Sequence, residues 1–304
     1  MTTIYPHRVS KSLFHELAGR NGKGGFPFVF EGCLIGLFND GYLFNIISEE
    51  ISLNPRAVQI RQKDWEGGHF TDVNAEDDFY LRDQKLIIPT LNVQIILDKA
   101  PFWDPTPLYL SRLLPFSKIR QNLDLLMKCH EEEMKLGSSL FHNAQKERVC
   151  SLERSFEKGN KQDIKSAIES LLGFGPGLTP SGDDFMVGVI AVMHFVGNIE
   201  TKLRPLKNMV TEIVFAALKK TTIISQAMLI EAIAGRFPYL ISSFMEHFLT
   251  NNDEEILLAC VHNLEKFGAS SGTNILDGAT WALRNVCQFE EERSDMVNVS
   301  SRHN

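Results

Sequence analysis

The sequence has few cysteines, and none has the spacing of a metal site or a disulfide framework. The five cysteines are scattered and include no C-x-x-C pair: Cys33, Cys129, Cys150, Cys260 and Cys287. Zinc ribbons and small disulfide-rich domains need closely spaced cysteines. We therefore expect free and mostly buried thiols.

Long hydrophobic runs are also missing. The longest apolar stretch, residues 185–196, is interrupted by Gly188 and His194 and is shorter than the roughly 18 residues that a membrane span requires. Residues 1–10 contain no apolar core of a secretion signal. We expect a cytoplasmic protein without a membrane segment.

Positive charge is not in excess, and histidine pairs are absent. The 304 residues carry a net charge of -7, whereas proteins that bind a phosphodiester backbone present clustered Lys and Arg. This argues against a nucleic acid partner. The nine histidines form no H-E-x-x-H or H-x-H pattern, so no transition-metal site is predicted. We interpret His194, on an apolar helix, as a core residue.

The first hundred residues have the pattern of β structure. Apolar residues run densely from Phe26 to Ser48, and Asn39, Asp40 and Gly41 lie between two apolar arms as a hairpin signal. We predict a small antiparallel β domain within residues 1–105. Further strands are expected at residues 57–62, 78–82, 85–89 and 92–97.

The remainder of the chain is predicted to be helical. Pro101, Pro105 and Pro107 mark the junction because they remove backbone donors, and apolar residues then recur every three or four positions. Residues 106–288 are predicted as a helical domain and residues 289–304 as a disordered polar tail, which gives an α+β fold class. Helices are expected at residues 116–141, 144–157, 162–172, 183–196, 201–219, 222–234, 239–249, 254–267 and 274–286. Their expected N-caps include Asn160 and Asp253, and the expected C-cap glycines are Gly173 and Gly268.

A glycine-rich segment from Gly173 to Asp184 carries the strongest functional signal. It contains four glycines, two prolines, two hydroxyl residues and two aspartates between two predicted helices. Glycines allow a backbone to approach a ligand, and the N–H groups at a helix start attract negative charge. We predict a site for a phosphate or carboxylate, with the following ligand-binding residues: Gly175, Gly177, Thr179, Ser181 and Gly182.

The two aspartates of this segment allow two interpretations. A carboxylate near a helix N-terminus can simply cap the helix. We favour this capping role for Asp183, and for Asp184 we give the capping role and a functional role equal weight. As candidate catalytic residues they would hold Mg²⁺ or a substrate amide N–H, or act as a base. Mg²⁺ is the cofactor considered. The segment lacks the G-K-[ST] ending of a Walker A loop and follows a predicted helix rather than a strand, so neither nucleotide motif fits.

A second segment repeats the first in reduced form. Ser181-Gly182-x-Asp184-x-x-x-Gly188 aligns with Ser271-Gly272-x-Asn274-x-x-x-Gly278. Both copies place Ser-Gly at a helix start and a glycine further along that permits close helix contact. If the two starts face one cavity, Ser271, Gly272 and Asn274 join the anion site; the alternative is two unrelated capped helices.

Hydroxyl residues also begin the helix that lies between these segments. Lys219 and Lys220 precede Thr221, Thr222 and Ser225. We interpret the lysines as complements to a helix C-terminus. Thr222 is expected to cap the next helix, and Thr222 and Ser225 are included among the candidate ligand-binding residues.

Together these motifs resemble the bacterial AllH family. The resemblance is carried by the run from Gly175 to Phe185, the Thr221-Thr222-x-x-Ser225 motif and the late Ser271-Gly272 turn. It covers the helical half, roughly residues 173–278. In the late motif Asn274 stands where an acidic residue would be expected.

The resemblance implies a subunit of an oxamate carbamoyltransferase with AllF-like and AllG-like partner subunits. This activity converts oxalurate and phosphate into oxamate and carbamoyl phosphate, and both products are small anions that suit a glycine-rich helix start. The S-T-R-T phosphate loop of aspartate and ornithine carbamoyltransferases is absent from this sequence. Three hypotheses follow: a carbamoyl- or phosphoryl-transfer subunit, a Mg²⁺-dependent enzyme on a small phosphorylated or carboxylated metabolite, and a non-catalytic anion-binding scaffold.

Overall fold

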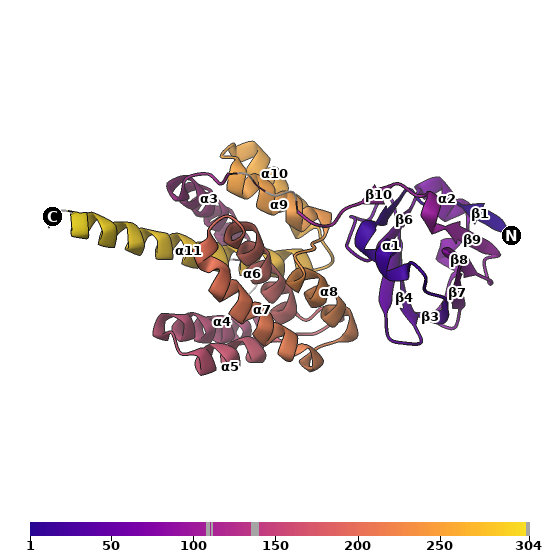
Figure 1. Ribbon diagram of the computed structural model, residues 1–304, viewed down its shortest axis with the longest axis horizontal. Helices are drawn as coiled ribbons and strands as arrows, with labels where there is room; N and C mark the ends of the chain where they lie inside the picture. The colour runs from indigo at the N-terminus through magenta and orange to yellow at the C-terminus, as the bar shows by residue number, and fades with distance from the viewer. Residues whose placement is uncertain (108–109, 111, 135–139, 302–304) are drawn as a thin grey trace. The chain divides into compact units, whose positions relative to one another are not determined.

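The computed structural model describes residues 1–107, 110, 112–134 and 140–301, without the side chains of residues 129–143 and 291–301. The chain divides into two compact units. The first comprises Met1–Pro107 and Arg236–Tyr239, and the second comprises Leu108–Gly235 and Leu240–Asn304. The first contains the sheet and the second is helical (Figure 1). The predicted α+β class is confirmed.

The first unit is built on one mixed sheet of ten strands in the order β1-β9-β8-β7-β3-β4-β5-β6-β2-β10. Pairing is antiparallel from β9 through β5, whereas β1–β9, β5–β6 and β2–β10 are parallel pairs. The sheet is therefore mixed rather than wholly antiparallel. The strands are β1 Thr2–Ile4, β2 Arg8–Ser10, β3 Gly22–Phe30, β4 Cys33–Phe38, β5 Leu43–Ser48, β6 Ala57–Ile60, β7 Asp78–Arg82, β8 Lys85–Ile88, β9 Val93–Ile96 and β10 Phe102–Trp103.

The predicted hairpin joins β4 to β5. Gly41 has φ +89° in its turn, a conformation that side chains disfavour. On one face of this sheet Phe38 and Phe79 meet edge to face with ring centroids 4.8 Å apart, and Phe44 lies 5.1 Å from Phe79. These three buried rings belong to the hydrophobic core of the first unit. The short helices of this unit are α1 Lys11–Leu17, α2 Gln62–Gly67, η1 Phe70–Asp72 and η2 Leu97–Lys99.

The second unit surrounds one buried helix, α6. Every residue of α6 except His194 is buried, because the helix is apolar on all sides and is covered by α7, α8 and α11 (Figure 1). The helices are α3 Phe116–Met134, α4 Leu140–Lys158, α5 Lys161–Leu171, α6 Ser181–Gly197, η3 Thr201–Leu203, α7 Arg204–Ala216, η4 Leu218–Lys220, α8 Ile223–Ile233, α9 Tyr239–Thr250, α10 Glu254–Glu265 and α11 Ser271–Ser301.

Local capping signals in the sequence correctly predict several helix ends. Asn160, Thr222 and Asp253 each accept a hydrogen bond from a backbone N–H in the first turn of the following helix. Gly173 and Gly268 adopt positive φ just beyond α5 and α10. These residues mark the starts of α5, α8 and α10 and the ends of α5 and α10.

Of three predictions for the helical unit, one is wrong and two stay predictions over part of their length. The helix expected at residues 116–141 is present as α3 up to Met134, residues 135–139 lie outside the described residues, and residues 140–141 belong to α4. The helix expected at residues 201–219 is divided into η3, α7 and η4. α11 continues to Ser301, and the disorder expected for residues 289–304 stays a prediction. Residues 289–301 contain neither proline nor glycine, and extending an existing helix costs little.

The described thiols are free. Cys33, Cys150, Cys260 and Cys287 form no disulfide, while the Cys129 side chain lies outside the described part of the chain. Burial raises the pKa of Cys33 and of Cys287 to about 11. None of the described helices combines the length and the hydropathy needed to cross a bilayer.

Candidate functional site

The first glycine-rich segment forms the connection between α5 and α6. Gly173, Gly175 and Gly177 adopt positive φ of 75°, 122° and 91°, which L side chains rarely adopt. Gly177 is exposed, with open space where a Cβ would be. The glycines thus permit the turn that brings the segment back to the start of α6.

Asp183 ties this connection to the start of α8. It is fully buried; one carboxylate oxygen accepts a hydrogen bond of 2.8 Å from the Gly173 N–H and the other accepts one from the Thr221 hydroxyl. Burial raises the pKa of Asp183, and the bonds from Thr221 and Gly173 act against that rise. Asp183 is therefore a hydrogen-bonded acid that joins three chain segments.

Asp184 is buried without such partners. It is 0 % exposed, and neither of its carboxylate oxygens has a hydrogen bond. Burial, together with the charge of Asp183, raises the pKa of Asp184 to about 8. The hydroxyls of Ser271 and Thr179 lie near enough to favour the ionised form, yet their geometry does not meet that of a hydrogen bond to Asp184.

A hydrogen bond links the two glycine-rich segments directly. The hydroxyls of Thr179 and Ser271 are 3.0 Å apart across 92 positions of the sequence. Both hydroxyls also influence Asp184. The structure therefore brings Asp184, Thr179 and Ser271 together at the starts of α6 and α11.

The two copies of the repeated motif are related in their packing. A Cβ on Gly188 would lie 2.0 Å from the carbonyl oxygen of Ile275, and one on Gly278 would lie 1.9 Å from that of Phe185. Ile275 follows Asn274 just as Phe185 follows Asp184, so each helix receives the equivalent carbonyl of the other. The helix contact that the glycines of the motif predict is present.

Gly182 and Gly272 have a packing role that the sequence did not indicate. A Cβ on Gly182 would lie 2.0 Å from the Leu171 carbonyl oxygen, and one on Gly272 would lie 1.8 Å from that of Leu264. Each glycine lets a helix start rest against the end of the preceding helix, α5 or α10. A ligand role for these two glycines stays a prediction, but a larger residue at either position would displace the backbone.

The other predicted residues surround this centre with structural contacts. The Ser181 hydroxyl donates to the Phe174 carbonyl at 3.3 Å, and the Thr222 hydroxyl donates to that of Leu178. Ser225 is fully buried; its hydroxyl lowers the pKa of Asp183, although its geometry falls short of a hydrogen bond.

Asn274 does not occupy the same environment as Asp184. Its amide donates to the Ser270 carbonyl at 2.9 Å, and its oxygen lies 3.3 Å from the Gln145 amide. These bonds secure the start of α11 and a contact with α4. They do not test its predicted contact with a ligand.

Thr221 is the contributor that the sequence analysis did not select. The motif Thr221-Thr222-x-x-Ser225 identifies the segment, but the helix-cap pattern favours Thr222. In the structure Thr221 contacts Asp183, 38 positions away. Lys220 forms an ion pair of 2.8 Å with Glu169, so this lysine is engaged by another helix.

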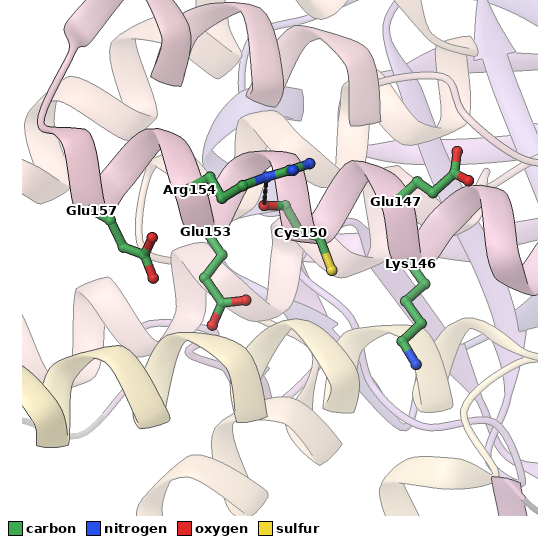
Figure 2. A pocket seen from close by; sticks show the side chains of 6 residues that line it. All are labelled: Lys146, Glu147, Cys150, Glu153, Arg154 and Glu157. Atoms are coloured by element: carbon green, nitrogen blue, oxygen red, sulfur yellow. Dashed lines mark hydrogen bonds between the residues drawn. The ribbon is translucent and has the colours of Figure 1, made fainter.

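A separate hollow of about 650 Å³ lies along α4, where the lining side chains have mixed charge. Figure 2 shows Glu153 directed toward α11, where it pairs with Arg284, and Arg154 donating to the Cys150 carbonyl. None of the predicted site residues lines this hollow. Its lining residues are Lys146, Glu147, Cys150, Glu153, Arg154 and Glu157.

Within the described part of the chain, no three His, Cys, Asp or Glu side chains are grouped so that they could hold a metal ion. Asp183 and Asp184 are adjacent, and hydroxyls of Thr179, Thr221 and Ser271 are their polar neighbours. The arrangement offers one hydrogen-bonded carboxyl and one that can donate or accept a proton.

The candidate site lies within a region of the chain that matches a known protein family. No solved structure matches the chain. The matched region runs from the last turn of α5 into α11, so it contains both glycine-rich segments and the Thr221 motif. Residues 171–283 match the family described as oxamate carbamoyltransferase subunit AllH, and over this region the resemblance is confirmed.

Proposed function

We propose that this chain is a carbamoyltransferase subunit that acts on oxamate and carbamoyl phosphate or on a related small anionic metabolite. The family match supports the activity class. We assign the function to the helical domain, residues 106–288, and place the substrate at the starts of α6 and α11. A cytoplasmic location is part of this proposal.

Asp184 is the observation that carries the proposal. An unpaired buried carboxyl is costly, and its cost is understandable where the group serves chemistry. With a pKa of about 8, Asp184 holds a proton at neutral pH. Two ionised carboxylates would repel an anionic substrate. A protonated Asp184 reduces this repulsion, because it offers a hydrogen-bond donor in place of a second negative charge.

The proposed chemistry gives this proton a destination. A phosphate oxygen attacks the carbamoyl carbon of oxalurate, and the bond from that carbon to the oxamate nitrogen breaks as carbamoyl phosphate forms. The departing nitrogen must gain a proton. Asp184 supplies it as general acid, and the proton that the attacking hydrogen phosphate loses restores Asp184 for the next turnover.

Partner subunits are part of the proposal because the matching family is described as a subunit. We expect AllF-like and AllG-like proteins to supply the remaining substrate contacts. The scaffold hypothesis differs in one respect: it assigns no proton transfer to this chain, so an Asp184 variant would retain activity in the assembled enzyme.

The test is phosphate-dependent cleavage of oxalurate by the chain assembled with these partners, with and without Mg²⁺. Asp184→Asn keeps the size of the side chain but removes the acid, and we expect kcat to fall by about 10²–10⁴-fold, the usual contribution of general acid catalysis. The control is Asp163→Asn, at an exposed position in the first turn of α5. Wild-type kcat in the Asp184 variant would exclude the catalytic role.

A further inference from the structure

Asp183 and Asp184 are adjacent carboxyls with opposite hydrogen bonding. Asp183 accepts the Gly173 N–H on one oxygen and the Thr221 hydroxyl on the other. Asp184, equally buried, accepts none. Hydrogen bonds from donors stabilise an ionised carboxylate, whereas burial without donors stabilises the neutral acid.

We propose that Thr221 is a positioning residue that places the single negative charge of the pair on Asp183 and leaves Asp184 as a protonated donor facing an anionic ligand. Thr221 acts through Asp183 and touches no reacting atom. The catalytic meaning of the inference rests on the proposed function, but the charge distribution can be measured without any substrate.

The surroundings of the pair support a single ionised carboxyl. On the side of α11 and the first glycine-rich segment, Asp184 faces the hydroxyls of Ser271 and Thr179; on the α8 side, Asp183 faces those of Thr221 and Ser225. The charged group that raises the pKa of Asp184 is Asp183 itself. Two adjacent buried carboxyls resist double ionisation, and the one that accepts more hydrogen bonds ionises first.

Thr221 is also suited to this task by its place in the chain. Its hydroxyl accepts the Thr222 N–H at 2.6 Å while it donates to Asp183, and its carbonyl accepts a 2.8 Å bond from the Gln226 side chain. Both the carbonyl and the N–H of the peptide unit between Thr221 and Thr222 are therefore hydrogen-bonded. A fixed hydroxyl donates in one direction, and this favours the ionised form of one carboxyl over the other.

The experiment is a pH titration of the full chain with ¹³C-labelled aspartate, followed by carboxyl-carbon NMR and assigned with Asp183→Asn and Asp184→Asn. We expect Asp183 to ionise at lower pH than Asp184. Thr221→Val removes the donor with little change in shape and should raise the Asp183 midpoint by about one pKa unit or more, since a hydrogen bond to a charged group is worth roughly that. Thr221→Ser should restore the wild-type midpoint.

The matched control is Thr211→Val in α7, where the hydroxyl bonds to the Lys207 carbonyl instead of a carboxylate. It should leave both midpoints unchanged. Ionisation of Asp184 before Asp183, or an unchanged Asp183 midpoint in Thr221→Val, would overturn the inference. Neither result depends on carbamoyl transfer, so the inference and the proposed function can fail separately.

Discussion

The hydroxyl of Thr179 lies 3.0 Å from the hydroxyl of Ser271, and this contact joins the connection before α6 to the first residue of α11. Thr179 belongs to the first glycine-rich segment and Ser271 to its reduced repeat, so this hydrogen bond links the two copies of the motif. Asp184 is buried beside it. The same pair of hydroxyls thus links the segments and adjoins the unpaired acid.

The Thr179–Ser271 bond should contribute measurably to stability. Thr179→Val and Ser271→Ala each remove one hydroxyl, and a double-mutant cycle in urea should give a coupling free energy of about 0.5–1.5 kcal/mol, the net value of a typical hydrogen bond. Additive effects of the two substitutions would mean that the bond is not formed in solution.

The crossing of α6 and α11 should tolerate no side chain at its glycines. Gly188→Ala and Gly278→Ala place a methyl group about 2 Å from a backbone carbonyl oxygen, and overpacking of this kind costs about 1–3 kcal/mol or more. Gly197→Ala is the control on α6, since its Cβ would meet its neighbours at an ordinary 3.8 Å. Urea denaturation should show a large loss of stability for the first two variants and none for the third.

Stability should fall with pH because of Asp184. Its folded pKa of about 8 lies above its ordinary value of 3.8, so the folded state binds more protons between these values. The favourable contribution is fully present below about pH 4 and is lost as pH rises toward 8, at up to about 1.4 kcal/mol per pH unit. Asp184→Asn should therefore equal the wild type near pH 4 and exceed it in stability at pH 8.

His194 acts in the opposite direction and must be separated from this effect. Burial lowers the pKa of His194 to about 4, so its contribution favours folding as pH rises from about 4 to its ordinary value of 6.5. Because both proteins contain His194, the difference in unfolding free energy between wild type and Asp184→Asn isolates the aspartate. A difference that does not grow with pH would contradict the raised pKa.

Features of the fold that depend on neighbouring residues are predicted well from the sequence. Features that depend on contacts between distant segments are not. The caps at Asn160 and Asp253 depend on residues two or three positions away, which a sequence displays directly. The parallel pairing of β5 with β6 depends on how distant segments meet, and so the expected antiparallel sheet is mixed.

The same distinction holds at the candidate site. Chemistry-bearing residues are visible in the sequence, so Asp183, Asp184, Thr179 and Ser271 could be selected. The contact of Thr221 with Asp183 spans 38 positions, and the carbonyl that Gly182 must accommodate belongs to α5. Neither contact leaves a periodic or compositional pattern in the sequence.

Binding of carbamoyl phosphate to the chain assembled with its AllF-like and AllG-like partners tests the central claim most directly. In calorimetric titrations at pH 7, wild type and Asp163→Asn should bind alike, and Asp184→Asn should bind at least about tenfold more weakly, because a lost bond to a charged ligand is worth roughly 1.5–3 kcal/mol. Equal affinity in all three proteins, or no binding by any of them, would contradict the assignment of the substrate site to the starts of α6 and α11.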